Sequence, residues 1–310
     1  MRIVTFLKAG QQHLGVWLNN QIMDVQAAGR LILSGTPSGE SFFRNTSNML
    51  DLLEAPVETW NILNHVIMKI NGAGLDRLGN FDSQEVLISS ENVQLMAPLP
   101  TPGKVICVAG NYPAPGAFQK PDYPTIFLKP SSTVTGSGMP IWISSLTKNV
   151  AYEVELALVI GKRTRHVTAE NALQHIVGYI LANDVGDRFL EKRTSQWTSG
   201  KMFDSFTPMG PWLVTQDEIP FPDELEMSTR VNDVILQRGN TANMFFRTAE
   251  LVSIISDLTT LRPGDVILTG SPKMMDGQPN PNHRLIPGDQ VKVSIDGLGE
   301  LINHVEKELE

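Results

Sequence analysis

The chain has 310 residues, a mass of 34.2 kDa, a formal net charge of −8 and a pI of about 5.3. A chain this acidic is poorly suited to hold nucleic-acid phosphates or an anionic membrane surface, so we expect neither as a partner. Its single cysteine, Cys107, excludes an internal disulfide framework and a cysteine-ligated metal cluster. The sequence shows no signal-peptide pattern and no apolar run of about 18 residues, so we expect a cytoplasmic protein.

Residues 1–96 are predicted to form a small N-terminal α/β domain. Alternating or helically spaced apolar residues predict strands at 1–6, 14–18 and 21–25, and helices at 49–54 and 60–71. The turn residues Asn19 and Asn20 join two of these strands into an antiparallel pair. Three prolines follow within residues 97–103, which no helix or central strand tolerates. We therefore place a domain boundary there.

Residues 103–310 are predicted to form a larger catalytic domain. Short apolar runs predict strands at 104–109, 125–129, 152–160, 177–182, 266–268 and 291–295. Helices are predicted at 168–174 and 248–258, and the second should bury Leu251, Ile254, Ile255 and Leu258. Many short strands with few helices and no regular strand–helix alternation favour a β-rich α+β fold.

Two glutamates interrupt the apolar strand at 152–160. Glu153 and Glu155 are two residues apart, so in a strand they project from the same face. At about 6–7 Å and an effective dielectric constant of about 20, two such charges repel by about 2.5 kcal/mol. A buried pair therefore stays ionised only beside a cation, and the alternative is an edge strand with both glutamates in water.

A third carboxylate, Asp184, follows the predicted strand at 177–182. Three carboxylates without a partnering cysteine or a His-x-x-x-His motif are typical of a hard-cation site. The sequence therefore indicates Mg²⁺, Mn²⁺ or Ca²⁺ rather than Zn²⁺.

A set of motifs in the catalytic part resembles the fumarylacetoacetate hydrolase (FAH) family in order and spacing. These motifs are Tyr-Glu-Val-Glu-Leu-Ala at 152–157, Gly-Tyr to Asn-Asp at 178–184, Gln-Trp-Thr-Ser-Gly-Lys-Met-Phe-Asp at 196–204, Pro-Met-Gly-Pro-Trp at 208–212, Val-Asn at 231–232, Gln-Arg-Gly-Asn-Thr at 237–241 and Pro-Gly-Asp-Val-Ile-Leu-Thr-Gly-Ser-Pro at 263–272. The resemblance covers residues 103–310 nearly end to end.

The resemblance implies an FAH-type mixed β-roll, a homodimer, and a divalent cation held by Glu153, Glu155 and Asp184. It places Lys201 toward the substrate, where an ammonium group suits a developing oxyanion. It also implies substrate contacts for three polar residues, Gln237, Thr269 and Ser271. Without the flanking motif, Lys201 would be interpreted as an ordinary surface lysine.

The sequence departs from the family pattern in two places. The family often has a histidine and a glutamate that activate water, and here these positions hold Pro115 and Phe118, neither of which can act as an acid or base. The glycine-rich segment after the Thr-Gly-x-Pro turn is replaced by Lys273 and two methionines. The sequence thus keeps the metal ligands but lacks the hydrolytic pair, and Asp187, Glu191 and His283 are the candidate replacement proton carriers.

These observations predict an FAH-family enzyme that acts on a small keto acid or 1,3-dicarbonyl through a metal-stabilised enolate. Its reaction would be that of a C–C hydrolase, a decarboxylase or an isomerase, and the missing pair predicts weak acylpyruvate hydrolysis. Two alternatives stay open: a dehydratase-type lyase of 2-keto-3-deoxy sugar acids, and a metal-holding binding protein without turnover.

Overall fold

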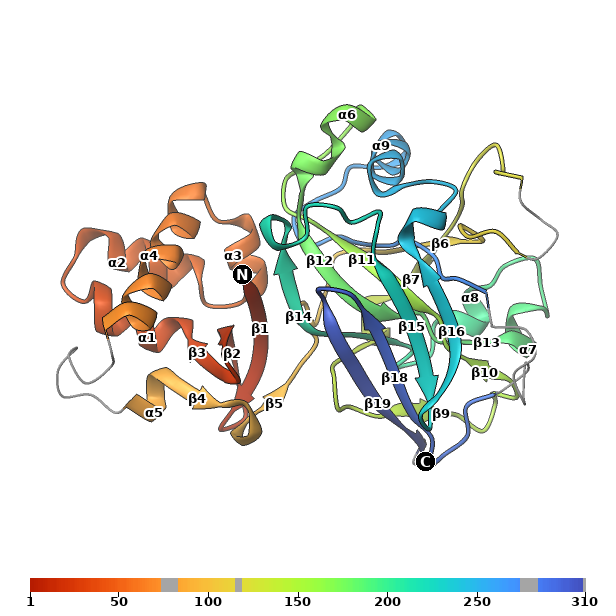
Figure 1. Cartoon of the computed structure of the whole chain (residues 1–310), viewed down its shortest axis with the longest axis horizontal. Helices are drawn as coiled ribbons and strands as arrows, with labels where there is room; N and C mark the ends of the chain where they lie inside the picture. Colours follow the sequence, from red (N-terminus) through yellow and green to blue (C-terminus); the bar gives the residue numbers. More distant parts are fainter. Residues whose placement is uncertain (74–82, 115–118, 274–283, 309–310) are drawn as a thin grey trace.

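The computed structural model describes residues 1–73, 83–114, 119–273 and 284–308 of the chain. Within these ranges strands predominate, and the β-rich α+β fold expected from the sequence is confirmed. Figure 1 shows a smaller part, which carries most of the longer helices, beside a larger part made mostly of strands. No helix in the described ranges has the length and apolar character of a membrane span.

The smaller part is built from an antiparallel meander covered by helices on one side. Its strands are β1 (Arg2–Lys8), β2 (Gln11–Leu18), β3 (Gln21–Asp24), β4 (Leu87–Ser89) and β5 (Gln94–Leu95). Its helices are α1 (Val25–Leu33), α2 (Pro37–Asn45), α3 (Met49–Glu54), α4 (Val57–Ala73) and α5 (Ser83–Val86). Asn19 and Asn20 both have positive φ angles in the turn between β2 and β3, as the sequence predicts for a tight hairpin.

The meander continues directly into the main sheet of the larger part. The order of this sheet is β4-β3-β2-β1-β14-β12-β11-β17-β6-β7, with β5 beside β1 and β8 beside β14. Its further strands are β6 (Val105–Ala109), β7 (Thr125–Lys129), β8 (Val134–Thr135), β11 (Val154–Ile160), β12 (Ile176–Asn183), β14 (Thr207–Thr215) and β17 (Val266–Leu268). Since β1 pairs with β14, the predicted boundary at 97–103 does not interrupt the sheet. The division into two domains stays a prediction.

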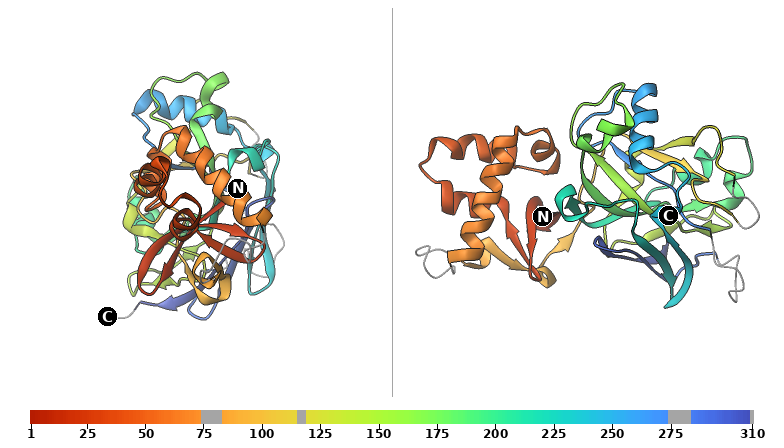
Figure 2. Two further views of the ribbon diagram at one scale, coloured as in Figure 1. Left: turned by 90° about the vertical axis from the view of Figure 1, so that its left-hand side faces the viewer. Right: turned by 45° about the horizontal axis from the view of Figure 1, so that its top comes forward.

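A second sheet packs against the main one and completes the larger part (Figure 2). Its order is β16-β15-β18-β19-β9, and β10 and β13 form a separate pair. The strands are β9 (Ile141–Ile143), β10 (Val150–Ala151), β13 (Gly186–Asp187), β15 (Glu226–Val231), β16 (Val234–Asn240), β18 (Gln290–Ile295) and β19 (Gly299–Lys307). The helices of this part are α6 (Ala169–Ala172), α7 (Arg188–Glu191), α8 (Thr198–Lys201) and α9 (Thr248–Leu258).

Apart from Glu155, strand β11 is apolar on both faces because each face meets a different core. Leu156 and Leu158 join the core between the two sheets, whereas Ala157 and Val159 join the core beneath the helices of the smaller part. All seven residues of β11 are buried. The strand that carries Glu155 is thereby fixed from both sides.

Two expectations about helices were wrong in detail. Leu258 was expected in the core, but it is 56% exposed because α9 ends there at the surface. The helix expected at 168–174 is shorter, since α6 gives way to a 3₁₀ turn at 173–175.

Helices α1 and α2 were not expected from the sequence. Gly29 lies in the middle of α1, where it weakens the helical pattern, but a Cβ there would lie 2.6 Å from the ring of Phe42 in α2. The glycine therefore permits close packing of the two helices.

Candidate metal centre and active site

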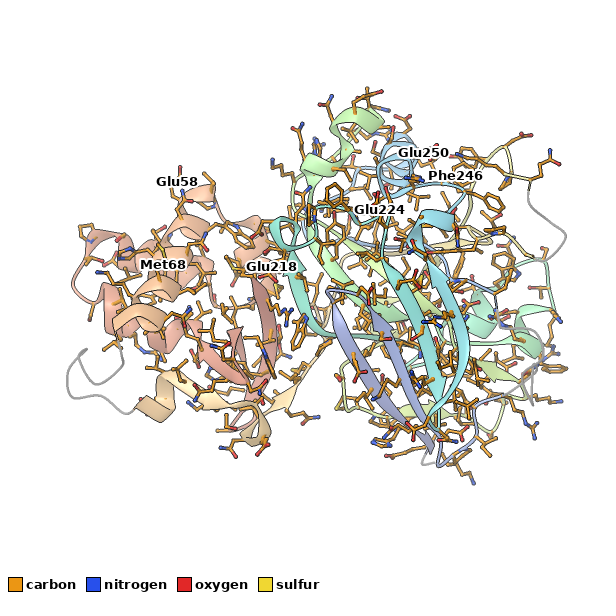
Figure 3. All side chains as sticks on the ribbon, viewed as in Figure 1. Glu58, Met68, Glu218, Glu224, Phe246 and Glu250 are labelled. Carbon is orange, nitrogen blue, oxygen red and sulfur yellow. The ribbon has the colours of Figure 1, made fainter. Side chains whose placement is uncertain are left out.

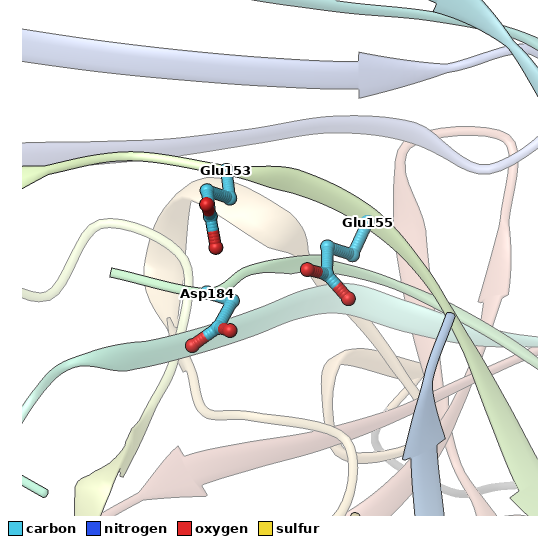
Figure 4. Close-up of side chains that lie close together, drawn as sticks. All are labelled: Glu153, Glu155 and Asp184. Carbon is cyan, nitrogen blue, oxygen red and sulfur yellow. The ribbon is translucent and has the colours of Figure 1, made fainter. Parts of the chain in front are cut away.

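Three carboxylates meet where two neighbouring strands of the main sheet end. Glu153 directly precedes β11, Glu155 is its second residue, and Asp184 directly follows β12. The strands are antiparallel, with Val154 opposite Asn183, so the start of one lies beside the end of the other. One ligand oxygen from each carboxylate lies within 4.8 Å of the others. Figure 4 shows the three side chains pointing toward a common space.

The backbone around these residues is tied together locally. The Asn183 side chain accepts a hydrogen bond from the Glu153 N–H at 2.9 Å, and the Asp184 N–H donates to the Glu153 carbonyl at 2.9 Å. Gly270, just after β17, donates its N–H to Glu155 Oε2 at 2.7 Å. Three chain segments that are distant in sequence therefore hold the carboxylates in place.

Three cationic side chains surround the cluster. Lys201 Nζ lies 2.8 Å from Glu153 Oε2 and 2.8 Å from Asp184 Oδ2, and Arg188 pairs with the other oxygen of Glu153. Lys129 Nζ lies 2.6 Å from Asp184 Oδ1 and also donates to two backbone carbonyls. Both lysines are almost completely buried. The chain thus neutralises Glu153 and Asp184 with its own groups.

Glu155 differs from the other two in its electrostatic surroundings. Burial, together with the nearby charges of Asp184 and Glu153, raises the pKa of Glu155 well above its ordinary value. Burial by itself would also raise the pKa of Glu153, but the ion pairs with Lys201 and Arg188 bring that pKa well below its ordinary value.

The donor set fits a hard divalent cation. All three groups are carboxylates, their oxygens converge, and Glu155 lies beside two like charges that a cation would offset. When bound, such a cation polarises a keto oxygen of a substrate. The assignment of Glu153, Glu155 and Asp184 as metal ligands stays a prediction that this geometry supports.

A cavity of about 440 Å³ opens over the three carboxylates. Phe127 and Trp197 form an apolar wall, with ring centroids 5.8 Å apart in an edge-to-face arrangement. The other described residues that line it include four cationic side chains, Arg188, Lys192, Lys201 and Lys273, and four anionic ones, Glu153, Glu155, Asp184 and Glu191. Its size suits a small organic acid.

The three residues expected to contact substrate occupy different positions. Ser271 lines the cavity. Thr269 is buried, and its hydroxyl donates to the Leu156 carbonyl at 2.9 Å. Gln237 is also buried, where its side chain accepts from the Val154 N–H and from Thr229 and donates to the Pro272 carbonyl. Both buried residues thus support the segments that carry the site, and a direct contact of any of the three with substrate stays a prediction.

The candidate proton carriers also occupy different positions in the structure. Asp187 is completely buried, and its oxygens accept hydrogen bonds from the backbone N–H groups of Lys148, Asn149 and Leu190, so it supports the backbone outside the cavity. Glu191 lines the cavity. His283 lies outside the described residues, as do Pro115 and Phe118.

Sequence reasoning missed Arg188, Lys129 and the aromatic wall. Arg188 is the first residue of α7, four residues after Asp184, and this spacing was the available signal. Lys129 is the last residue of β7, whose sequence has an ordinary β-strand pattern. The position of β7 at the edge of the main sheet is known only from the pairing of β6 with both β7 and β17.

Comparison with known proteins identifies the family. A model described as the C-terminal part of fumarylacetoacetate hydrolase matches residues 104–306. A mitochondrial oxaloacetate tautomerase of Xenopus laevis is 41% identical over 229 residues, which are 72% of this chain and 72% of that protein. A fumarylacetoacetate hydrolase from psychrophilic Exiguobacterium antarcticum has a TM-score of 0.78 at 30% identity and covers 99% of this chain and 100% of its own.

A further solved structure contains a metal. It is a maleylpyruvate hydrolase from Sphingobium sp. SYK-6 in complex with manganese(II) and pyruvate, with a TM-score of 0.76 at 28% identity over 100% of both chains. The family model spans more than half of this chain, so the chain belongs to the fumarylacetoacetate hydrolase family. The predicted class, a keto-acid enzyme of this family, is confirmed.

Proposed function

We propose that this member of the family catalyses keto–enol tautomerisation of a small dicarboxylic 2-keto acid of the oxaloacetate type, with Mg²⁺ or Mn²⁺ held by Glu153, Glu155 and Asp184. The observation that carries the proposal is the charge of the cavity. Among its described lining residues, four are cationic and four anionic. A divalent cation would leave a formal surplus of two positive charges, which complements a substrate with two carboxylates.

Lys201 is suited to stabilise the charge that develops on the keto oxygen. Its ammonium group is held at the base of the cavity by Glu153 and Asp184, each at 2.8 Å. A donor fixed before the reaction needs no reorganisation when the enolate forms. Arg188, Lys192 and Lys273 supply the remaining positive charge for the substrate carboxylates.

Two observations favour tautomerisation over C–C hydrolysis. In the family pattern the histidine and glutamate that activate water for hydrolysis stand at positions 115 and 118, and here these are a proline and a phenylalanine, which do not titrate. No histidine is among the described residues that line the cavity. The similarity to an oxaloacetate tautomerase supports the same choice.

The test follows the ultraviolet absorbance of the enol form of oxaloacetate as it converts to the keto form. We expect the purified protein with Mg²⁺ to reach a kcat/KM of ~10⁴ M⁻¹s⁻¹ or more, and EDTA or Glu155→Gln to abolish the acceleration. Acylpyruvates and 2-keto-3-deoxy acids are assayed in parallel. No acceleration, or a higher kcat/KM for hydrolysis or dehydration, would overturn the proposal.

We further propose that the chain forms a homodimer. Several large apolar side chains are exposed on β7, α7 and α8 or next to them, among them Leu128, Phe189, Trp197 and Met202. Apolar surface of this kind is typical of an association surface. Light scattering on the purified protein distinguishes a mass of two chains from a mass of one. The cytoplasmic location stays a prediction.

A further inference from the structure

Glu191 is the one carboxylate among the described lining residues that the three-carboxylate cluster does not use. It is the last residue of α7 and is 7% exposed. Its Oε2 atom accepts a hydrogen bond from Arg188 Nη1 at 2.9 Å. Its Oε1 atom is buried without a hydrogen-bond partner and lies 4.0 Å from Lys201 Nζ. Buried polar atoms nearly always have a hydrogen-bond partner. An oxygen without one, in a residue that lines a cavity, therefore indicates an interaction with a ligand.

Two glycines leave the space that this carboxylate occupies. A Cβ at Gly200 would lie 2.7 Å from Glu191 Cγ, and a Cβ at Gly186 would collide with Glu191 Oε1 and lie 2.8 Å from Lys201 Cδ. The segments on both sides of the side chain are therefore shaped around it. Arg188 binds one oxygen, and the other is buried beside Gly186 and Lys201 without a hydrogen-bond partner.

Glu191 is the group best placed to accept a proton, because the ionisable groups near it have other roles. Arg188 and Lys201 carry protons already, whereas Glu153, Glu155 and Asp184 form the proposed metal site. Asp187 uses its oxygens for backbone N–H groups. Among the described residues that line the cavity, Glu191 is thus the carboxylate that is not a proposed metal ligand and that has an oxygen without a hydrogen-bond partner.

We propose that Glu191 transfers the proton in the enolisation, an inference that rests on the proposed function. Its carboxylate takes a proton from the carbon next to the keto group, and the electron pair of that C–H bond forms the C=C bond. The carbonyl electron pair moves onto the oxygen, where Lys201 stabilises the charge. Delivery of the same proton to this oxygen, directly or through one water, gives the enol and restores the carboxylate. No oxidant or other reactant is needed.

The first arm of the test replaces Glu191 by glutamine, which keeps the shape and the acceptor for Arg188 but cannot take a proton. We expect Glu191→Gln to lower kcat for tautomerisation by at least ~10²-fold. The KM and the calorimetric Kd for Mg²⁺ should stay within about threefold of the wild-type values. The matched control is Glu170→Gln, an exposed glutamate on α6 that does not line the cavity, which should leave all three constants unchanged.

The second arm asks whether a free carboxylate replaces the side chain. In Glu191→Ala, added formate should restore kcat in a concentration-dependent manner, which a merely structural role of Glu191 would not produce. An unchanged kcat in Glu191→Gln, absence of rescue by formate, or loss of Mg²⁺ binding together with activity would overturn the assignment of Glu191 while the proposed function stands. A wild-type protein without tautomerase activity would overturn both.

Discussion

Glu155 has the least positive charge beside it of the three carboxylates at the metal centre. Glu153 pairs with Lys201 and Arg188, and Asp184 pairs with Lys201 and Lys129. Within the described part of the chain, Glu155 forms no ion pair and accepts one backbone N–H, from Gly270. A cation bound at the cluster therefore has its largest electrostatic effect at Glu155.

The first prediction concerns Glu155→Gln. We expect calorimetry to show Mg²⁺ affinity reduced by at least ~10²-fold, because a charged ligand is lost. In EDTA the variant should melt a few degrees above the wild type, since one of three mutually repelling buried carboxylates is gone. Glu170→Gln serves as the control with unchanged charge at the site. Unchanged Mg²⁺ affinity would refute the ligand assignment.

The second prediction concerns Lys201→Met, which keeps an unbranched side chain one atom shorter and removes its charge. The activity should fall by at least ~10²-fold, the usual effect of removing one oxyanion donor. Mg²⁺ affinity should stay equal or rise, because Glu153 and Asp184 lose a competing cation. Activity assays and Mg²⁺ calorimetry on one preparation separate the two effects. Joint loss of metal and activity would instead indicate a structural role.

At the scale of elements, the site depends on the close approach of two very short helices. Asp187 caps the N-terminus of helix α7, where its carboxylate accepts the Leu190 N–H at 2.8 Å. Helix α8 packs against it through Gly200, where a Cβ would lie 2.6 Å from the Asp187 carbonyl and 2.8 Å from the Glu191 nitrogen. These contacts are with backbone atoms, which side-chain rotation cannot relieve.

The third prediction compares two glycines. Gly200→Ala should destabilise the protein by about 1–3 kcal/mol, because the methyl group forces the two helices apart. Gly72→Ala, in α4 with no atom within 4 Å of the new Cβ, should be neutral or stabilising by about 0.5–1 kcal/mol. Chemical denaturation of both variants measures the difference. Equal stabilities of the two variants would contradict the packing argument.

At the scale of the molecule, the smaller part is joined to the larger by a shared sheet and a shared core. Ile3 of β1 pairs with Leu213 of β14, and Leu52 of α3 belongs to the same apolar cluster as Ile180 of β12. Figure 3 labels Glu218 at this junction, and the Met1 amino group lies 2.7 Å from its carboxylate. A continuous core favours cooperative unfolding of both parts.

The fourth prediction follows from this continuity. Differential scanning calorimetry should show one transition for the whole chain. Mg²⁺ at about 100 times its Kd should add about 2.7 kcal/mol to the free energy of unfolding and shift the entire transition upward. Glu155→Gln is the control that should lack the shift. Two transitions, of which only one responds to Mg²⁺, would show that the smaller part unfolds independently.

Much of the local structure follows from the sequence. The hairpin at Asn19 and Asn20 needs residues that tolerate positive φ angles, and the pattern of 49–54 matches α3. Glu153 and Glu155, together with Asp184 after a later strand, indicated a hard-cation site because carboxylate charges in apolar strands require a nearby positive charge. These features depend on neighbours in the chain, and local chemistry is sufficient to predict them.

The tertiary structure decided which distant groups meet. Lys129 enters the site because strand pairing brings β7 near the end of β12, and nothing within either segment specifies that pairing, whereas Arg188 and Glu191 follow Asp184 by four and seven residues. It also gave two nearby carboxylates different positions: Asp187 accepts hydrogen bonds from backbone N–H groups, whereas Glu191 lines the cavity. The sequence by itself determined the chemical types at the site, because charge and side-chain shape are local properties. Their partners were decided by folding, because contacts between residues far apart in the chain depend on the packing of the whole molecule.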